Sequence, residues 1–259
     1  MIVETSRGSF GVHFESDGAP NVLALHPLAL SGAVWEGVGD GAATRLRLMG
    51  LDARGHGVSS WDGRPFTVED MADDAAAVIK ATASGPVGVI GLSMGGSTAL
   101  VLAARHPSLV SRVVIADATA CYGPDRVERW AERARSAEFK PREQQLEFQR
   151  ERWFGPAFRE AHPETVSRVC DIFLRTSGAA HAAACRALGG LDATGQLGKI
   201  TAPALVVVGS EDYATPPATA RAIAAAIPGA ELMVLEGTRH MSLIEQPSVW
   251  ARIEAHLGT

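Results

Sequence analysis

Short apolar runs alternate with longer amphipathic stretches along most of this chain. Continuous apolar runs are typical of strands buried on both faces, whereas apolar residues three or four apart indicate helices. The alternation of the two predicts a mostly parallel sheet wound with crossover helices. We predict eight strands, the first two as an antiparallel start, at residues 1–4, 9–15, 21–25, 44–51, 87–92, 112–116, 204–208 and 231–235.

Helical patterns fill the gaps between these strands. Thr67 is a predicted N-cap, because Asp70 follows three positions later as in a capping box, and the pattern continues to about Ala81. Residues 122–190 interrupt the alternation of strands and helices, since they contain charged helical segments and no convincing strand. We therefore predict an α/β core made of residues 1–121 and 191–259, with a helical cap of residues 122–190 inserted after the sixth strand.

Composition is that of an ordinary globular protein, with 46% hydrophobic and 20% charged residues among 259. The formal net charge of −5 would repel a phosphate backbone, so nucleic acid is a poor partner. The segment 122–190 carries +2 and the remainder −7. Composition alone favours a solvated helical face for this segment, where charges of both signs are common.

The number and spacing of the cysteines and the length of the apolar stretches indicate in which cellular compartment the protein is expected. Three cysteines, at positions 121, 170 and 185, form an odd set without short ligand spacing, which argues against a disulfide framework and a thiolate zinc site. Residues 1–7 turn polar too early for a secretory signal, and no apolar stretch reaches the ~20 residues of a membrane span. We expect a cytoplasmic protein without a membrane partner.

The strongest chemical motif lies where the predicted strand 87–92 meets a helical pattern. There the sequence reads Gly91-Leu92-Ser93-Met94-Gly95, a Gly-x-Ser-x-Gly nucleophile elbow. The strand-to-helix turn strains the serine, and glycines on either side let neighbouring backbone approach. Ser93 is therefore the predicted nucleophile.

A serine hydroxyl needs a base, and in this architecture the acid and then the histidine follow the serine along the chain. His240 lies in a loop directly after the apolar strand 231–235, which makes it the predicted base. Asp212 and Asp117 both follow strands and could orient the imidazole. We favour Asp212, in the loop after the penultimate strand, and keep Asp117 as the alternative.

An oxyanion hole needs two backbone N–H donors. The first is predicted at Met94, the residue after the nucleophile, and the second in the turn after the strand 21–25. Because Pro27 has no N–H, the candidate donor in that turn is Leu28. His26 is expected to support the turn rather than to react.

Together these motifs identify the chain as a member of the α/β-hydrolase superfamily, with the α/β-hydrolase fold, and the resemblance runs from His26 to Pro247. Within that superfamily it resembles the 3-oxoadipate enol-lactonases of aromatic catabolism. The matching segments are residues 52–57, 91–96, 152–158 and 209–217. The chain departs from that family at residues 26–29 and 241–243, and we expect both departures to touch the active-site wall.

The resemblance implies acyl transfer by Ser93, His240 and Asp212 on a small enol-lactone with an acetate arm, with no metal or organic cofactor. The triad alone cannot exclude a broader carboxylesterase, a lactonase or a carbon–carbon bond hydrolase. A binding module without turnover is disfavoured, because it would usually lack a triad residue.

A carboxylate arm needs a donor fork in a desolvated pocket, which arginine supplies better than lysine. The segment 122–190 is rich in arginine. Arginines beside aromatic residues are the best candidates, because a ring can exclude water and stack on the guanidinium. The substrate-binding candidates are Arg129, Trp130, Arg133, Arg152 and Trp153.

Overall fold

The computed structural model of the protein describes residues 1–14, 21–38 and 46–258. Its eight strands form one sheet in the order β1-β2-β4-β3-β5-β6-β7-β8. β2 pairs antiparallel with β1 and β4, and the remaining neighbours pair in parallel. The strands are β1 (Ile2–Thr5), β2 (Gly8–Phe14), β3 (Val22–Leu25), β4 (Leu48–Leu51), β5 (Val87–Leu92), β6 (Val110–Ala116), β7 (Ala204–Gly209) and β8 (Glu231–Leu235).

The predicted fold class is confirmed, and the strand bounds differ by a few residues. β6 begins at Val110, two positions before the predicted start. β4 begins at Leu48, so the strand predicted at 44–51 is shorter than its apolar pattern suggested. Glu15 and residues 44–45, which belonged to predicted strands, lie outside the described residues.

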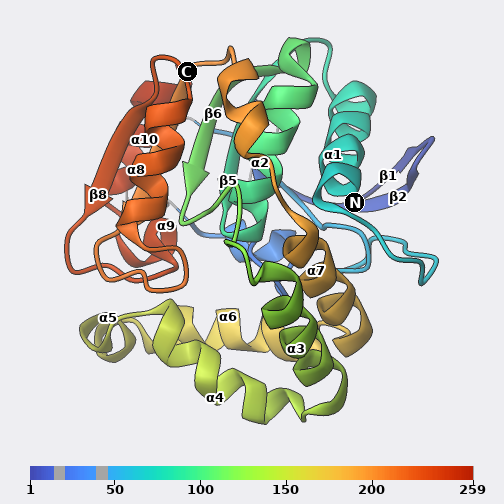
Figure 1. The fold of residues 1–259 in the computed structure, drawn as a ribbon, viewed down its shortest axis with the longest axis vertical. Helices are drawn as coiled ribbons and strands as arrows, with labels where there is room; N and C mark the ends of the chain where they lie inside the picture. Colours follow the sequence, from blue (N-terminus) through green and yellow to red (C-terminus); the bar gives the residue numbers. More distant parts are fainter. Residues whose placement is uncertain (15–20, 39–45, 259) are drawn as a thin grey trace.

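Helices connect the strands and extend past them (Figure 1). The helices are α1 (Val68–Thr82), α2 (Met94–Arg105), α3 (Arg126–Phe139), α4 (Arg142–Trp153), α5 (Pro156–Ala161), α6 (Pro163–Arg175), α7 (Gly178–Gly190), α8 (Pro217–Ala226), α9 (Ser242–Glu245) and α10 (Val249–Leu257). Short 3-10 turns are η1 (Gly32–Trp35), η3 (Pro107–Leu109) and η4 (Thr194–Lys199). No helix among the described residues is long and apolar enough to cross a bilayer.

α2 and α10 lie on opposite faces of the sheet. A Cβ at Gly88 would approach Leu257 of α10, whereas a Cβ at Gly91 would overlap the backbone of Gly95 in α2. Because successive residues of a strand point to opposite faces, residues three apart face opposite sides. The central strand β5 is therefore covered on both faces, which explains why all six of its residues are buried.

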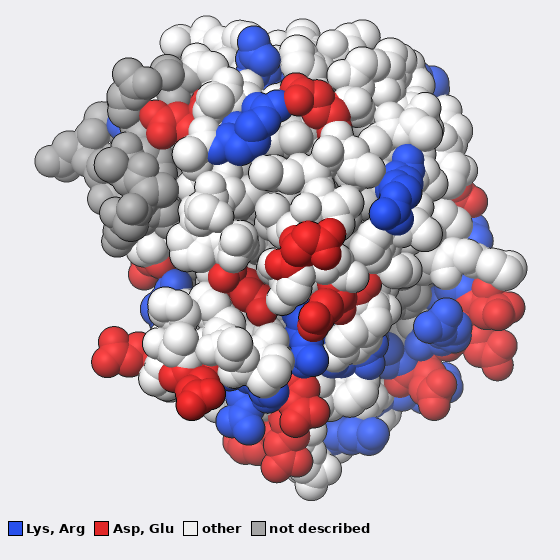
Figure 2. Space-filling view, turned by 90° about the vertical axis from the view of Figure 1, so that its left-hand side faces the viewer, with Lys and Arg blue, Asp and Glu red and all other residues white. Residues whose placement is uncertain are grey.

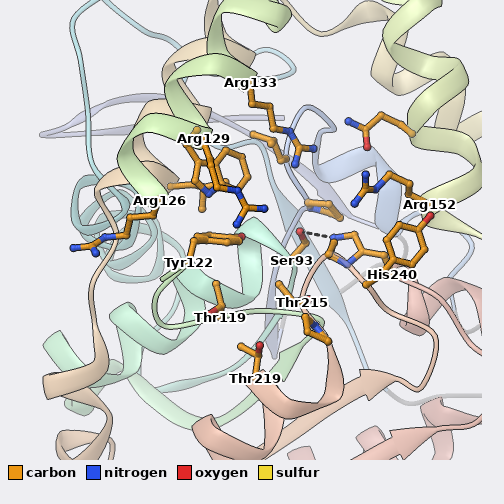
Figure 3. Close-up of a pocket in the computed structure, with 18 of the residues that line it drawn as sticks. Ser93, Thr119, Tyr122, Arg126, Arg129, Arg133, Arg152, Thr215, Thr219 and His240 are labelled. Atoms are coloured by element: carbon orange, nitrogen blue, oxygen red, sulfur yellow. Dashed lines mark hydrogen bonds between the residues drawn. The ribbon is translucent and has the colours of Figure 1, made fainter. Parts of the chain in front are cut away.

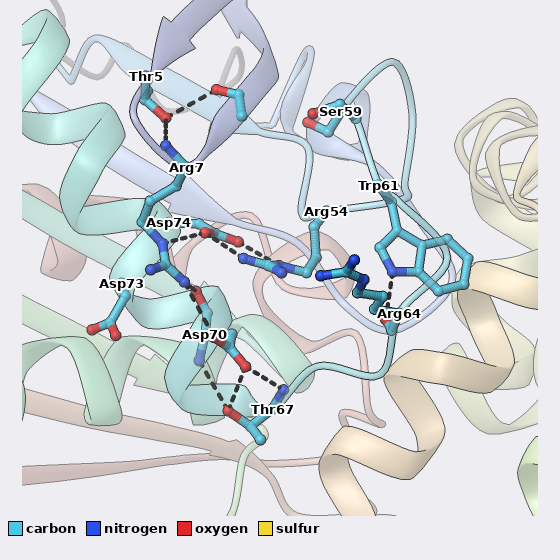
Figure 4. Close-up of polar contacts among 12 residues, drawn as sticks. Thr5, Arg7, Arg54, Ser59, Trp61, Arg64, Thr67, Asp70, Asp73 and Asp74 are labelled. Carbon is cyan, nitrogen blue, oxygen red and sulfur yellow. Dashed lines mark hydrogen bonds and ion pairs between the residues drawn. The ribbon is translucent and has the colours of Figure 1, made fainter.

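The predicted capping box starts α1 (Figure 4). The Thr67 hydroxyl accepts a hydrogen bond from the backbone N–H of Asp70 at 3.1 Å, and the Asp70 carboxylate accepts one from the backbone N–H of Thr67 at 3.0 Å. Two N–H groups near the helix start are thereby satisfied. α1 ends at Thr82, one residue beyond the predicted end.

A buried carboxylate on α1 fastens the loop that follows β4 (Figure 4). Asp74 accepts two hydrogen bonds from the Arg54 guanidinium, both of 2.6 Å, and a third from Arg7 at 2.7 Å. Asp74 is 2% exposed, so the two arginines supply the partners that a buried charge requires. The segment 52–57, one of those that resemble the enol-lactonases, is therefore held by a structural ion pair.

The five helices α3–α7, here called the helical layer, follow β6 in the chain and lie beyond the end toward which the β6 arrow points (Figure 1). The backbone N–H of Gly155 donates to the Glu245 carboxylate at 2.7 Å, and the N–H of Met241 donates to the Trp153 carbonyl at 3.0 Å. These bonds tie the layer to the segment that follows β8, which contains α9. Charged side chains of both signs crowd the lower part of the molecule in Figure 2, which is the part that holds the layer.

Candidate active site

Ser93 occupies a strained turn between β5 and α2. Its backbone has φ 58° and ψ −116°, a conformation that non-glycine residues rarely adopt. A Cβ at Gly91 would overlap the carbonyl oxygen of Gly95, and one at Gly95 would overlap the carbonyl oxygen of Leu25. Only glycine fits these two positions, so the tight turn that directs the serine hydroxyl toward His240 depends on them.

A continuous hydrogen-bonded chain joins three of the predicted site residues. The Ser93 Oγ lies 2.9 Å from His240 Nε2, and His240 Nδ1 lies 2.8 Å from the Asp212 Oδ2. Ser93 is 7% exposed, His240 9% and Asp212 2%, so the chain is largely shielded from water. The geometry permits the imidazole to accept the serine proton while the carboxylate fixes its tautomer.

The two competing aspartates have different partners. Asp212 also accepts hydrogen bonds from the N–H groups of Ala214 and Thr215, at 2.8 and 3.1 Å. Asp117, which has a φ of 45°, instead accepts from the N–H groups of Gly209 and Ser242, both at 3.0 Å. Asp117 therefore joins the end of β7 to the start of α9, whereas Asp212 accepts the hydrogen bond from His240 Nδ1–H.

Electrostatic interactions favour a protonated His240 paired with an ionised Asp212. Burial disfavours the imidazolium, but the charge and hydrogen bond of Asp212 outweigh it and raise the pKa of His240 above its usual 6.5. Burial likewise opposes the Asp212 carboxylate, and His240 nevertheless holds its pKa below the usual value. For Asp117, burial followed by the nearby charge of Asp212 raises the pKa to about 7.

The turn after β3 carries the candidate second oxyanion donor. The N–H of Leu30 donates to the Pro27 carbonyl at 3.2 Å, and Ala29 has a φ of 60°. No acceptor for the Leu28 N–H is found among the described residues, and Met94 is the first residue of α2, where helix N–H groups lack intrahelical partners. Both donors predicted for the oxyanion are thus free.

His26 supports this turn from behind. Its Nδ1–H donates to the Pro27 carbonyl at 2.7 Å, and its Nε2 accepts from the N–H of Ala53 at 3.0 Å. Burial lowers the pKa of His26, which agrees with a neutral ring that donates on one side and accepts on the other. His56 packs 5.1 Å from His26 between ring centroids, and burial lowers the pKa of His56 to about 3.

A cavity of about 500 Å³ lies between Ser93, His240 and the helical layer. Its wall includes all five substrate-binding candidates from the sequence. The lining residues are Pro27, Leu28, Ser93, Thr119, Cys121, Tyr122, Gly123, Arg126, Arg129, Trp130, Arg133, Gln149, Arg152, Trp153, Phe173, His181, Leu188, Tyr213, Ala214, Thr215, Pro216, Thr219 and His240. No aspartate or glutamate is among these described lining residues, so the cavity is an electropositive compartment in an acidic protein.

The arginines differ in direction (Figure 3). The guanidinium groups of Arg129, Arg133 and Arg152 point toward the space beside Ser93, whereas Arg126 points away from it. Arg126 lies 3.5 Å from the carboxylate of Asp192. For the first three, no ion pair with a carboxylate is found in the described parts of the chain.

Aromatic rings position two of these arginines, with pairings that the sequence did not reveal. The Arg133 guanidinium lies 4.8 Å from the centre of the Trp130 ring. The Arg152 guanidinium lies 4.5 and 4.7 Å from the rings of Phe148 and Tyr213, rather than against its chain neighbour Trp153. Burial lowers the pKa of Arg152 from its usual value.

Sequence reasoning missed several lining residues. Tyr122, Gln149 and His181 carry no motif, and only helical periodicity on α4 could have indicated that Gln149 faces inward. The expectation that residues 241–243 touch the wall was wrong. All three residues are buried, the N–H of Ser242 donates to the Asp117 carboxylate, and none of the three is among the described lining residues.

A model of the alpha/beta hydrolase fold family matches residues 20–247. The chain belongs to this family. An enzyme of Acinetobacter baylyi, 3-oxoadipate enol-lactonase 2, is 32% identical over 203 residues, which make up 77% of this chain and 73% of the relative. The resemblance inferred from the motifs is thereby confirmed at the level of the family.

Solved structures agree over the whole fold. The crystal structure of the enol-lactonase from Burkholderia xenovorans has a TM-score of 0.90 at 26% identity and covers 99% of each chain. A thermophilic esterase from Thermogutta terrifontis, solved with malate bound, has a TM-score of 0.86 at 25% identity and covers 99% of this chain and 98% of its own. The similar proteins of this fold thus include lactonases and esterases.

Proposed function

We propose that this protein is a serine hydrolase that opens a small lactone bearing a carboxylate arm, with 3-oxoadipate enol-lactone as the leading substrate. The observation that carries the proposal is the juxtaposition of two features. The hydrogen-bonded chain of Ser93, His240 and Asp212 ends at a cavity with three convergent guanidinium groups and, among the described lining residues, no carboxylate. Such a cavity favours an anionic substrate.

The chemistry follows from the positions of the groups. Ser93 Oγ attacks the ring carbonyl carbon while His240 Nε2 accepts its proton, and the N–H groups of Leu28 and Met94 receive the developing oxyanion. The tetrahedral intermediate collapses with cleavage of the bond to the ring oxygen, which leaves an acyl-serine. His240 returns the proton to the released enolate, which becomes the ketone of the same molecule.

The second half of the reaction uses the same groups. A water molecule gives a proton to His240 Nε2 as its oxygen attacks the acyl carbon, and the bond to Ser93 Oγ then breaks. His240 returns the proton to the serine oxygen. One lactone and one water yield the keto diacid, and Asp212 stabilises the imidazolium that forms twice in the cycle.

Two comparisons support an acidic substrate. Relatives named 3-oxoadipate enol-lactonases match much of the chain, and the related esterase was solved with malate, a small dicarboxylate. A broader carboxylesterase is the second candidate. It is favoured by the aromatic share of the cavity wall, where Trp130, Trp153 and Phe173 offer apolar surface that a six-carbon lactone would not fill.

A substrate panel tests the proposal. Purified protein is assayed with 3-oxoadipate enol-lactone, with simple lactones and with 4-nitrophenyl esters. The proposal predicts the highest kcat/KM for the acidic enol-lactone. Turnover of neutral esters with a higher kcat/KM than the acidic lactone would instead establish the carboxylesterase.

A further inference from the structure

Two glutamines of α4 lie on the same inward face but have opposite hydrogen-bonding states. Gln145 and Gln149 are four residues apart, so their side chains point to one side of the helix, and both are buried. The Gln145 amide donates to the carbonyls of Ala137 and Lys140, at 3.4 and 2.7 Å, and accepts from Arg142 at 3.3 Å. Its hydrogen-bonding capacity is used within the protein.

Gln149 is 8% exposed, and its side-chain amide has no hydrogen-bond partner among the described residues. Its nitrogen and oxygen are not among the buried atoms sealed from solvent, and the residue lines the cavity above Ser93. The amide therefore reaches the cavity rather than a protein partner, although most polar groups of buried side chains are hydrogen-bonded. The missing partner is therefore expected inside the cavity.

The surroundings of Gln149 define what that partner is. Arg152 follows three positions later on the same helix and is thus a surface neighbour of Gln149. Arg152 and Arg133 both point into the cavity without a carboxylate partner in the described chain. A ligand group held there is anionic, and the donor that Gln149 offers to an anion is its Nε2–H.

We propose that Gln149 is a specificity-determining residue that donates its Nε2–H to a carboxylate oxygen of the substrate, completing a receptor with Arg133 and Arg152. This inference rests on the proposed function, because it assigns the carboxylate arm to one wall of the same cavity. The neutral amide adds a directed donor without adding charge. It therefore favours a carboxylate over a neutral group at this position.

The first test measures binding without turnover. Adipate, a stable dicarboxylate, is titrated calorimetrically into wild type, Gln149→Leu and Gln149→Glu at pH 8. Loss of one hydrogen bond to a charged group predicts that Gln149→Leu raises the Kd for adipate about 10- to 100-fold. Gln149→Glu is expected to weaken binding at least as much, because its charge repels the ligand and competes for the two arginines.

Matched controls separate this role from a structural one. Gln144→Leu and Gln144→Glu make the same changes at an exposed glutamine of α4 and are expected to leave the Kd for adipate unchanged. The neutral diamide of adipic acid is not expected to lose affinity in Gln149→Glu. Adipate affinity that stays at the wild-type level in both Gln149 variants, or no adipate binding to wild type, would overturn the inference.

The second test compares two lactones that share one ring. One is 3-oxoadipate enol-lactone, and the other has a methyl group in place of the acetate arm. Gln149→Leu is expected to raise KM for the acidic lactone about 10- to 100-fold with little change in kcat, and to leave the methyl lactone unaffected. An equal loss on both lactones would show a structural role.

The two tests fail separately. If wild type hydrolyses neither lactone, the proposed function is wrong, and the adipate titration still decides whether Gln149 binds a carboxylate. If wild type hydrolyses the acidic lactone and Gln149→Leu keeps the wild-type ratio between the two lactones, the function stands and the role of Gln149 is wrong.

Discussion

The two walls of the cavity differ in whether their polar side chains have hydrogen-bond partners within the protein. On the sheet side, Ser93, His240 and Asp212 are bonded to one another, and Asp212 has further backbone and hydroxyl partners. On the helical-layer side, Gln149 lines the cavity and the Arg133 guanidinium points into it, and neither side chain has a hydrogen-bond acceptor among the described residues. A network whose hydrogen bonds are all made within the protein is preorganised for one reaction, whereas donors without a protein acceptor can bind a ligand. The comparison assigns chemistry to the sheet loops and selectivity to the layer.

The largest effect is expected on the sheet side. Ser93→Ala removes the attacking oxygen and should lower kcat on the order of 10⁶-fold, as loss of the nucleophile does in a serine protease. The fold should persist, because the side chain contributes little packing. A serine-directed phosphonate, followed by mass spectrometry, should label wild type at Ser93 and leave Ser93→Ala unlabelled. Labelling at another serine would contradict the assignment.

The next largest effect is the difference in kcat between variants of the two aspartates. Asp212→Asn keeps the shape but favours the wrong imidazole tautomer, so kcat should fall by about 10⁴. Asp117→Asn should cost far less activity, because Asp117 contacts the Gly209 and Ser242 backbone rather than the imidazole. Its main effect should be on the free energy of unfolding, measured by urea denaturation. The reverse ranking in kcat would make Asp117 the orienting acid.

Arginine variants test the selectivity of the opposite wall. Arg133→Ala and Arg152→Ala should each raise KM for the acidic enol-lactone about 10- to 100-fold, because each removes a charge-assisted hydrogen bond. The methyl lactone should be hydrolysed nearly as before. Arg126→Ala is the matched control, since Arg126 points away and pairs with Asp192. Uniform losses on both lactones would contradict a role in selectivity.

The pH profile reports on the base of the sheet side, His240. The free imidazole of His240 must be neutral to act as base, and its pKa is raised above 6.5. kcat/KM should therefore fall about tenfold per pH unit below a midpoint that lies above 6.5. Arg133→Ala should leave the fall intact and shift its midpoint slightly upward, because the Arg133 charge lowers the pKa of His240. A midpoint below 6.5 would contradict the charged pair.

The smallest expected effect is the difference in the free energy of unfolding between variants of the two glutamines. Gln145→Leu removes the amide that bonds the Ala137 and Lys140 carbonyls and also removes one acceptor of Arg142, so it should lower the free energy of unfolding by about 1–3 kcal/mol. Gln149→Leu removes an amide that has no partner in the described protein and should be neutral or stabilise by up to about 1 kcal/mol. Urea denaturation of both variants measures the difference. Similar destabilisation by both would mean that Gln149 has a structural role.

Local pattern was enough to predict most of the sheet and the order of the reactive groups. Strands such as β5 and β7 appear where continuous apolar runs end in glycine or loop residues, because burial on both faces requires such runs. The elbow at Ser93 is recognisable because the glycines that its turn requires lie within five consecutive residues. The position of His240 follows from the strand before it. Each of these features depends on neighbours in the chain.

Only the tertiary structure shows which hydrogen bonds form between residues that are far apart in the sequence. Asp117 and Asp212 both follow strands, and only their packing shows that Asp212 reaches His240 while Asp117 accepts hydrogen bonds from backbone N–H groups at the end of β7 and the start of α9. Gln145 and Gln149 have the same side chain on the same helix face. Whether each amide meets a carbonyl or a cavity is set by how α4 packs against the other helices of the layer and the sheet. The sequence by itself determined the elements and the reactive groups; their partners, and the donors left without one, were decided by the folded chain, because hydrogen bonds between distant segments exist only after packing fixes their distance.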